Sequence, residues 1–574
     1  MPAKKKRVLV TSALPYVNNV PHLGNLIGSV LSADAYARFA RLDGNEVLFV
    51  LGTDEYGTTA EAKAMEEGIT PRQLVDKYFK IHKNIYDWFE TSYDCLGRTT
   101  SPENAKIAQH IFLKMHENGY ILEKTEQQLY SEKIGRFLSD RFVEGECPFC
   151  HSPGARGDQC DKCGKLIDQK DLISPKSKID GSSLMLRNTK HLYVDLAKLE
   201  PELRAWMNKV DKNWSAQAKT ITEQWMKAGL KERAITRDLE WGIPVPLPGW
   251  EKKVFYSWFD APIGYVGITS ECLGEKWKDW WMQAEAKDLT LYQFMGKDNT
   301  VFHSIMFPGY LIGTKENWKL VDYLAITAFL NYEGDKFSKS KGVGVFGNDA
   351  MHSGIVADVW RYYLFRIRPE SDDTDFSWSD FEAKVNNEVV GNFGNFVNRI
   401  AALSEKFSDT KRSAGKSTVL IDSIKPLFEE YRKLMSAAEL KDALMKANEI
   451  STVGNKYLQD NAPWTKAKTD LLAANGIIAE CIDLVKVLAC VYYPFMPVAC
   501  EKVWKMVGEK KKISETGFVA AFKGVKEGTP IEKQGLLFEK LDPKKIAELK
   551  EKFAGKKDEE PKKDEKNKVP LKKP

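Results

Sequence analysis

A chain of 574 residues is too long for one ordinary hydrophobic core, so roughly two to four domains are expected. Hydrophobic residues make up 43% of the chain and charged residues 29%, which excludes a disordered or fibrous protein. The net charge of +5 neither requires nor excludes RNA as a partner, because a small net charge can conceal one basic face.

No segment predicts export or a membrane span. The N-terminal stretch MPAKKKRVLVTSALP is basic but lacks an apolar core of signal-peptide length. The most apolar later run, KVLACVYYPFMPVAC, contains Pro494 and Pro497 and is followed by Glu501, so it predicts a buried helix. We therefore expect a cytoplasmic protein without membrane contact.

The first fifty residues predict a strand, a helix and a second strand. RVLVTSAL reads as a buried strand, and EVLFVLG (46–52) as another. Between them, apolar residues recur at the helical steps of three and four: Leu23, Leu26, Val30, Ala33, Ala37 and Ala40. This crossover is the unit of a parallel α/β sheet, so the predicted fold class is a Rossmann-type nucleotide-binding domain.

Changes in pattern along the chain predict the remaining organisation. Residues 1–120 and 239–325 form the two halves of the sheet domain, since strand-like segments return with KVFYSWFDAPIGY, LTLYQFMGKD and KLVDYLAIT. Residues 121–238 are an insertion, and 326–385 follow the sheet with a lysine-rich loop. A helical domain spans 386–545, and the Lys-rich segment 546–574 is expected to be disordered.

Nine cysteines fall into two groups. Five are scattered and are typical of buried thiols in a reducing compartment, namely Cys95, Cys272, Cys481, Cys490 and Cys500. The other four form two Cys-x-x-Cys pairs nine residues apart, Cys147 with Cys150 and Cys160 with Cys163. Four thiolates favour one tetrahedral, structural Zn²⁺ rather than a redox pair, with His151 only a neighbour.

The segment VPHLGN (20–25) lies where the first strand leads into the first helix. Pro21 suits a helix start, Gly24 leaves room for a planar ligand, and amides at a helix N-terminus attract phosphate. His22 could donate a hydrogen bond to that phosphate. A helix cap or a surface residue is the alternative interpretation of this histidine.

A second motif, NYEGDKFSKSKGVGV (331–345), concentrates Lys336, Lys339 and Lys341 on a glycine-flanked loop. By itself it is typical of a solvated surface loop. Combined with VPHLGN, it predicts mobile cations that stabilise charge developing on nucleotide phosphates.

These two motifs resemble the signatures of class I aminoacyl-tRNA synthetases, with Asn25 and Phe337 at positions where His and Met are commoner. Five further segments are similar to the methionyl-tRNA synthetase family over nearly the whole chain: SALPYVNNVPHLGN, GTDEYGT, FYSWFDAPIGY, GKDNTVFHS and NAPWTKAK. The resemblance implies ATP-dependent activation of L-methionine, with Mg²⁺ accompanying ATP, and transfer to initiator and elongator tRNA(Met).

The resemblance also implies which residues bind each substrate. The implied catalytic residues are His22, Asn25, Lys336 and Lys339. The implied ATP site adds Pro21, Gly24, Gly296, Asp298 and Ser338. The implied methionine site comprises Ala13, Leu14, Tyr16, Asp54, Trp258, Ala261, Pro262, Tyr265 and His303. Aromatic walls suit a thioether, and a carboxylate suits the α-ammonium.

For the tRNA anticodon, the resemblance implies Asn395, Arg399, Pro463 and Trp464. The first two are four residues apart and share a helical face, and unpaired bases can stack on Trp. Three alternatives remain: another class I synthetase, a simple nucleotidyltransferase and a catalytically silent tRNA-binding paralogue. Contact with an accessory protein or a multi-synthetase assembly is also left open.

Overall fold

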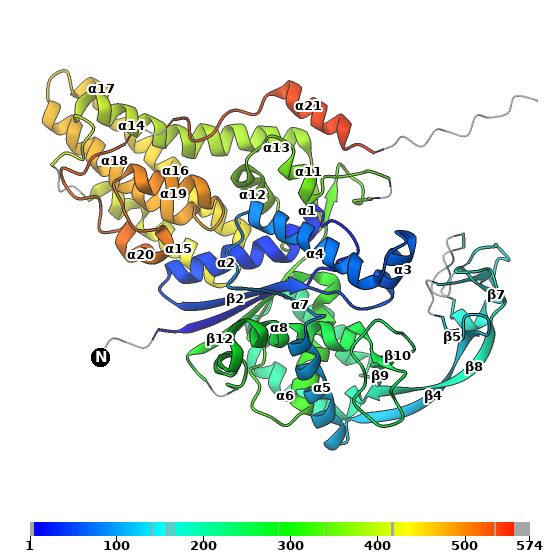
Figure 1. Ribbon diagram of the computed structural model, residues 1–574. Helices are drawn as coiled ribbons and strands as arrows, with labels where there is room; N and C mark the ends of the chain where they lie inside the picture. Colours follow the sequence, from blue (N-terminus) through cyan, green and yellow to red (C-terminus); the bar gives the residue numbers. More distant parts are fainter. Residues whose placement is uncertain are drawn as a thin grey trace, which may run out of the picture.

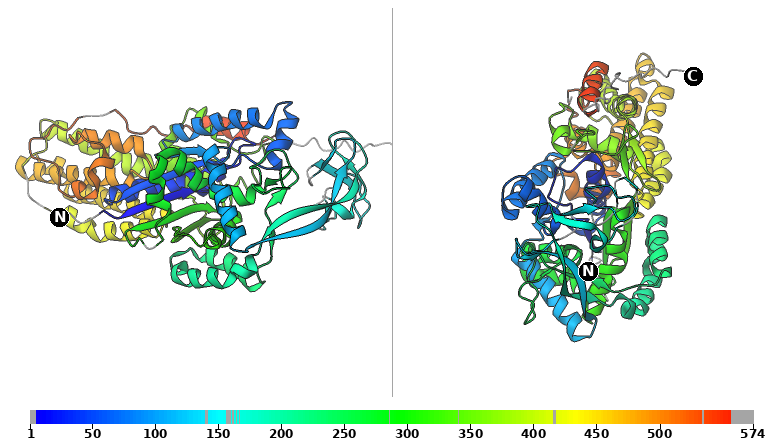
Figure 2. Two further views of the ribbon diagram at one scale, coloured as in Figure 1. Left: turned by 60° about the horizontal axis from the view of Figure 1, so that its bottom comes forward. Right: turned by 90° about the vertical axis from the view of Figure 1, so that its right-hand side faces the viewer.

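The computed structural model describes residues 5–138, 142–155, 160, 162–163, 165, 167–284, 286–339, 341–414, 418–532 and 535–555. Three parts follow one another in space: a helical bundle, a central sheet domain and a curved two-stranded arm (Figures 1 and 2). The sheet domain therefore contacts both of the other parts.

The central sheet has five parallel strands in the order β13-β12-β1-β2-β3. Their bounds are β1 (Arg7–Ser12), β2 (Glu46–Thr53), β3 (Cys95–Arg98), β12 (Leu289–Gly296) and β13 (Tyr323–Thr327). The predicted Rossmann-type sheet is confirmed. The chain order reverses beside β1, which pairs with both β2 and β12. In such sheets, ligands bind beyond the carboxyl ends of the strands at this reversal.

Helices cover both faces of the sheet. The helix predicted after β1 is present as α1 (Leu23–Asn25), a π-helical turn η1 (Leu26–Val30) and α2 (Leu31–Leu42). The other helices around the sheet are α3 (Thr58–Glu66), α4 (Pro71–Trp88), α5 (Pro102–Glu117), α8 (Ser257–Leu273), α9 (Lys278–Trp281), η7 (Phe302–Met306) and α10 (Phe307–Gly313).

The prediction of a strand in KVFYSWFDAPIGY was wrong. Only β11 (Val254–Phe255) is extended, and the rest of the segment begins α8. This helix is buried on nearly all sides, so its sequence lacks the polar face that marks a surface helix. It approaches the sheet closely, because a Cβ on Gly52 or Gly97 would lie 2.3 or 2.8 Å from atoms of Ile268.

The insertion is a long antiparallel ribbon of β4 (Ile121–Ser131) and β8 (Met185–Val194), which curves away from the sheet domain (Figure 1). Short strands flank it: β5 (Arg136–Phe137), β6 (Val143–Glu146), β7 (Ile173–Ser177) and β9 (Arg233–Ala234). The helices α6 (Leu196–Val210) and α7 (Ala216–Lys227) return the chain to the sheet domain.

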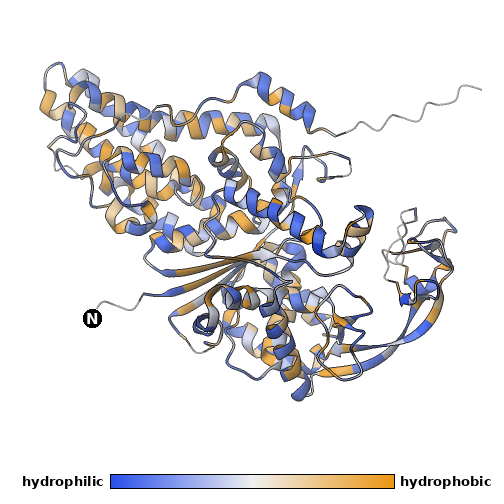
Figure 3. Cartoon of the chain, viewed as in Figure 1, coloured by the Kyte–Doolittle hydropathy of each residue, from blue (hydrophilic) through white to orange (hydrophobic). Residues whose placement is uncertain are grey.

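The C-terminal part is a helical bundle whose helices carry both hydrophobic and hydrophilic residues (Figure 3). Between the sheet and the bundle lie α11 (Gly347–Met351), α12 (Ala357–Arg366) and α13 (Trp378–Lys384). The bundle contains η8 (Val385–Gly394), α14 (Asn395–Phe407), α15 (Val419–Ser436), α16 (Leu440–Asn461), α17 (Pro463–Lys466), α18 (Leu471–Tyr492), α19 (Pro497–Met506) and α20 (Ile513–Ala521). No helix of the described chain is long and apolar enough to cross a membrane.

The predicted disorder from residue 546 onward was wrong for the first ten residues. Helix α21 (Pro543–Lys552) continues the ordered chain, with Ile546 and Leu549 buried. Phe553 then stacks on Trp378 with ring centroids 6.3 Å apart. These apolar side chains, spaced three and four apart, anchor an otherwise Lys-rich segment. Residues 556–574 lie outside the described residues.

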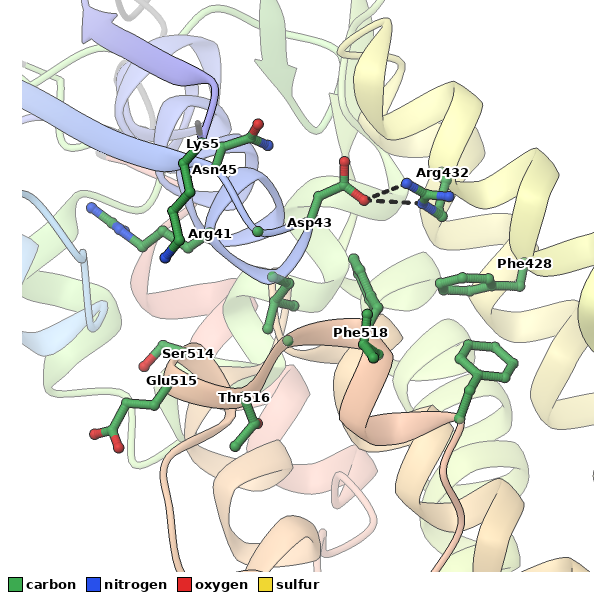
Figure 4. A pocket seen from close by; sticks show the side chains of 15 residues that line it. Lys5, Arg41, Asp43, Asn45, Phe428, Arg432, Ser514, Glu515, Thr516 and Phe518 are labelled. Carbon is green, nitrogen blue, oxygen red and sulfur yellow. Dashed lines mark hydrogen bonds and ion pairs between the residues drawn. The ribbon is translucent and has the colours of Figure 1, made fainter. Parts of the chain in front are cut away.

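Two ion pairs, one of them fully buried, join the sheet domain to the bundle. The guanidinium of Arg361 lies 2.7 Å from Asp34 of α2 and also donates to the carbonyl oxygen of Pro494. Although burial acts to raise the pKa of Asp34, Arg38 and Arg361 lower it to about 2. Arg432 of α15 forms a second ion pair with Asp43, 2.6 Å long, at the edge of a cavity of about 480 Å³ (Figure 4).

Two of the scattered cysteines are bonded to each other, which corrects the prediction of five buried thiols. Cys95 of β3 and Cys272 near the end of α8 form a disulfide with Cα atoms 5.8 Å apart. They are 177 residues apart in sequence, and only the packing of α8 beside β3 brings them together. Cys481, Cys490 and Cys500 are buried free thiols, as predicted.

Candidate active site

A cleft of about 490 Å³ opens beyond the carboxyl ends of β1 and β12. Seven of the predicted nucleotide-binding residues line it: Pro21, His22, Gly24, Asn25, Gly296, Asp298 and Lys339. Two others do not. Lys336 is exposed outside the cleft, and the backbone of Ser338 pairs with Val343 in a tight turn.

His22 both caps the first helix and faces the cleft. Its Nδ1 accepts a hydrogen bond from the backbone N–H of Asn25, and the Asn25 side chain accepts one from the backbone N–H of His22. Burial lowers the pKa of His22 to about 4, so the ring is neutral at physiological pH. Because Nδ1 accepts, the proton of the neutral ring is on Nε2, which is left as a donor.

The lysine loop lies against this histidine. The rings of Phe337 and His22 stack with centroids 4.5 Å apart and an angle of 6° between their planes. The Nζ atom of Lys339 lies 4.4 Å from the ring centroid of Phe346, at the edge of the cleft. An aromatic side chain at position 337 therefore anchors the loop by stacking.

A second, narrow cavity of about 40 Å³ adjoins the cleft. All nine predicted methionine-site residues line it: Ala13, Leu14, Tyr16, Asp54, Trp258, Ala261, Pro262, Tyr265 and His303. The sequence reasoning missed three others, Ser257, Asn299 and Phe302. The first is adjacent to Trp258, and the last two lie within four residues of His303, so neighbouring sequence was the available signal.

Neutral groups dominate the wall of this cavity. His303 is held by two hydrogen bonds, 2.8 Å from its Nε2 to the Tyr265 hydroxyl and 2.9 Å from its Nδ1 to the carbonyl oxygen of Asn299. A carbonyl can only accept, so Nδ1 carries the proton and Nε2 accepts from Tyr265. Burial lowers the pKa of His303 to about 4, which keeps the ring uncharged.

Asp54 is the acidic group at this cavity. It is buried, and its Oδ1 has no hydrogen-bond partner among the described residues. Burial, and then the charge of Glu55, raise the pKa of Asp54 well above its usual value. A buried carboxylate without a compensating cation favours binding of a cationic group.

Asp260 is a further buried acid that the sequence reasoning missed. It lies in the first turn of α8, and neither carboxyl oxygen has a partner among the residues with described positions. Burial and the nearby Asp54 raise the pKa of Asp260 well above its usual value. The motif FDAPIGY contains this residue, but nothing in the sequence shows that its side chain is buried.

The four clustered cysteines meet at the far end of the arm. Their sulfur atoms all lie within 4.8 Å of one another, with separations of 3.8 Å between Cys147 and Cys163 and 3.7 Å between Cys150 and Cys160. His151 instead pairs with Glu146 at 2.6 Å. The cluster could hold one metal ion, and no second such group occurs among the described residues.

Two of the predicted anticodon residues, Arg399 and Trp464, are in contact on the bundle. Asn395 is the first residue of α14 and is exposed, and Arg399 lies one turn later. The guanidinium carbon of Arg399 is 5.4 Å from the ring centroid of Trp464. Pro463 is buried at the start of α17 and directs Trp464 from there.

Comparisons with known proteins agree with this architecture. Residues 8–401 match the family described as tRNA synthetases class I (M), and residues 408–558 match the anticodon binding domain of methionyl tRNA ligase. The sheet, the cleft at its reversal point and the attached bundle are those of a class I tRNA synthetase.

Individual relatives are similar over nearly the full length of this chain. The cytoplasmic methionine–tRNA ligase of Saccharomyces cerevisiae is 46% identical over 96% of this chain and 74% of its own length. That of Arabidopsis thaliana is 45% identical over 96% and 72%. The Mycobacterium tuberculosis methionyl-tRNA synthetase, solved with methionyl-adenylate, has the same fold at 22% identity and a TM-score of 0.77, covering 93% of this chain and 99% of that one. The chain belongs to the methionine–tRNA ligase family.

Proposed function

We propose that this chain activates L-methionine with ATP and then transfers the methionyl group to the terminal ribose of tRNA(Met). One observation carries this proposal: the cleft and the narrow cavity share Ala13, Leu14, Tyr16 and Asn299 as common lining. An amino acid in the cavity would therefore present its carboxylate to a nucleotide in the cleft, and such positioning accounts for much of the rate of two-substrate reactions.

In the first step, the methionine carboxylate attacks the α-phosphorus of ATP and pyrophosphate leaves. Asp54 holds the α-ammonium, and the uncharged Tyr265–His303 pair suits a thioether. His22 donates from Nε2, and Lys339 adds positive charge at the cleft edge. Mg²⁺ accompanies ATP and neutralises its phosphates. We assign Asn25, Pro21, Gly24, Gly296 and Asp298 to the remaining contacts with ATP.

Lys336 and Ser338 belong to this proposal only if the lysine loop shifts when ATP binds. Both lie on the segment that carries Lys339, and Phe337 between them is the residue anchored to His22.

In the second step, a ribose hydroxyl of the tRNA attacks the methionyl carbonyl and releases AMP.

The cysteine cluster is proposed to hold one structural Zn²⁺. With Zn–S bonds of about 2.3 Å, the edge of a tetrahedron measures about 3.8 Å. The two recorded sulfur separations, 3.7 and 3.8 Å, match this edge. Four protein ligands leave no open position for catalysis, so the metal stabilises the tip of the arm.

For tRNA recognition we propose Asn395, Arg399, Pro463 and Trp464 as contacts with the anticodon of initiator and elongator tRNA(Met). The Arg399–Trp464 pair offers a flat ring and a planar cation for unpaired bases. We also propose a cytoplasmic location, which the names of the yeast and plant relatives support. The disulfide does not by itself favour a reducing compartment.

The experiment that tests the function is ATP–pyrophosphate exchange with each of the twenty amino acids, without tRNA. Exchange with methionine alone is expected. Exchange with a different amino acid would retain the chemistry and overturn the specificity, and no exchange with any of them would contradict activation in the absence of tRNA.

A further inference from the structure

A further cavity, of about 230 Å³, lies between the arm and the sheet domain. We propose that it receives the terminal adenine of the tRNA during methionyl transfer. This inference rests on the proposed function, because only the transfer step brings the 3′ end of a tRNA to the methionine site. The cavity is separate from the cleft and from the methionine pocket, and none of the sequence-predicted site residues lines it.

The cavity is adjacent to the methionine pocket. Tyr256 lines the cavity, Trp258 lines the methionine pocket, and their ring centroids are 5.0 Å apart. Thr58, on another side of the cavity, follows Asp54 by four residues. A base held here would keep its own ribose next to the methionyl carbonyl, which is the geometry that transfer requires.

The lining suits a flat heterocycle. The guanidinium carbon of Arg237 lies 4.0 Å from the ring centroid of Tyr256, so a planar cation and an aromatic ring form one wall. Phe137, Ala234 and Leu239 supply apolar surface. Unpaired nucleobases bind proteins by stacking on aromatic and arginine planes and by hydrogen bonds at their edges.

Two amide oxygens on the same cavity favour a base with an exocyclic amine, which adenine, cytosine and guanine carry and uracil lacks. The Oε1 atom of Gln128 accepts no hydrogen bond from any described residue, because its contacts with Glu126 and His191 are made through Nε2. The Oε1 atom of Gln169 is buried and also lacks a donor within the described chain. The exocyclic amine of adenine carries two N–H donors, which these two oxygens would satisfy.

Two variants and a matched control test the site. Gln128→Ala removes an edge contact, and Ala234→Leu fills the cavity. Gln127→Ala is the control, since Gln127 is exposed and alternation along β4 points it to the opposite face. Methionine-dependent pyrophosphate exchange should stay within about twofold of wild type in all three. Single-turnover transfer from preformed methionyl-adenylate should fall about tenfold in the two test variants only.

A tRNA ending in purine riboside, which lacks the exocyclic amine, identifies the occupant. Wild-type transfer to this tRNA should fall at least about tenfold, and Gln128→Ala should add no further loss, because the amine that contacts Gln128 is already absent. Fully additive losses, or wild-type transfer by both test variants, would overturn the proposal. Binding of free AMP in the cavity, together with transfer that does not depend on the terminal base, would contradict the proposal and identify a free nucleotide as the occupant. Absence of exchange by the wild-type enzyme would instead contradict the proposed function.

Discussion

Lys339 is the lysine of the KFSKS loop that lines the cleft, and we propose that its ammonium stabilises the departing pyrophosphate. We predict that Lys339→Ala lowers the rate of methionine-dependent pyrophosphate exchange by at least about 10²-fold, because one preorganised charge is lost from the transition state. Binding of tRNA, measured by filter retention, should be unchanged.

Lys341→Ala is the matched control for this prediction, since Lys341 lies on the same loop but does not line the cleft. Its exchange rate should stay within about threefold of wild type. Equal losses in both variants would show that the loop contributes only its general positive charge.

Asp260 keeps a raised pKa because it is buried beside Asp54 and its carboxyl oxygens have no hydrogen-bond partner among the described residues. An acid with a raised folded-state pKa retains its proton in the folded protein after the unfolded chain has released it. The free energy of unfolding therefore falls as the pH rises from the unfolded value, near 3.8, through the folded one.

We accordingly predict that Asp260→Asn, which cannot ionise, raises the melting temperature at pH 8 by about 2 °C or more. The increase in melting temperature should be smaller at pH 5, because ionisation of wild-type Asp260 then destabilises the folded protein less. Calorimetry at both pH values measures this, with the exposed Asp279→Asn as the control. A gain of the same size at both pH values would contradict the titration argument.

At the scale of single residues, motifs predicted which side chains lie together. All nine residues predicted for a methionine site line one cavity. Lys336 and Ser338 were predicted from the same motif as Lys339, yet neither lines the cleft. A motif conveys residue type and spacing, but the direction of each side chain in a loop depends on local backbone geometry.

At the scale of elements, α8 shows where periodicity fails. A helix buried on nearly all sides has no clear polar face, and its run of aromatic and apolar residues is the same signal that a buried strand gives. The strands β1, β2, β12 and β13 were predicted because turn signals bound them at strand length. Helix α21 was missed because only a few apolar anchors lie within its Lys-rich sequence.

The tip of the arm has its own small hydrophobic core, separate from that of the sheet domain. It includes Cys147, Cys160 and a few apolar side chains such as Leu129 and Phe142. A core of this size needs a metal or another cross-link to stay folded. We predict that chelation with 1,10-phenanthroline releases one Zn²⁺ per chain.

Amide hydrogen exchange shows whether that loss is local. Exchange in β6 and β7 should increase on chelation, while exchange in β1 and β2 should be unchanged. Cys150→Ala should reproduce the effect without chelator. Release of no metal, or an equal increase in the central sheet, would contradict the prediction.

At the scale of the whole molecule, the contacts that join the parts are invisible in sequence. Arg361 meets Asp34 across 327 positions, and Arg432 meets Asp43 across 389. Each of these side chains would be expected at a surface when only its neighbours in sequence are considered. Composition and periodicity predicted the sheet domain, the insertion and the bundle, but long-range pairing arises only from their assembly.

Helix α17, which carries Trp464, lies at the end of the bundle away from the central sheet (Figure 1), so we expect anticodon binding to be separate from activation. Trp464 lies on the bundle beside Arg399 and contributes no surface to either substrate cavity. We predict that Trp464→Ala raises KM for tRNA(Met) at least about tenfold, since base stacking on an aromatic ring contributes about 1–3 kcal/mol. Trp464→Phe, which keeps a stacking surface, should recover most of this loss, and pyrophosphate exchange should be the same in both variants.

An acceptor-stem minihelix without an anticodon should be charged equally by wild type and Trp464→Ala. Unequal charging of the minihelix would show that Trp464 acts through the fold of the bundle and not through the anticodon.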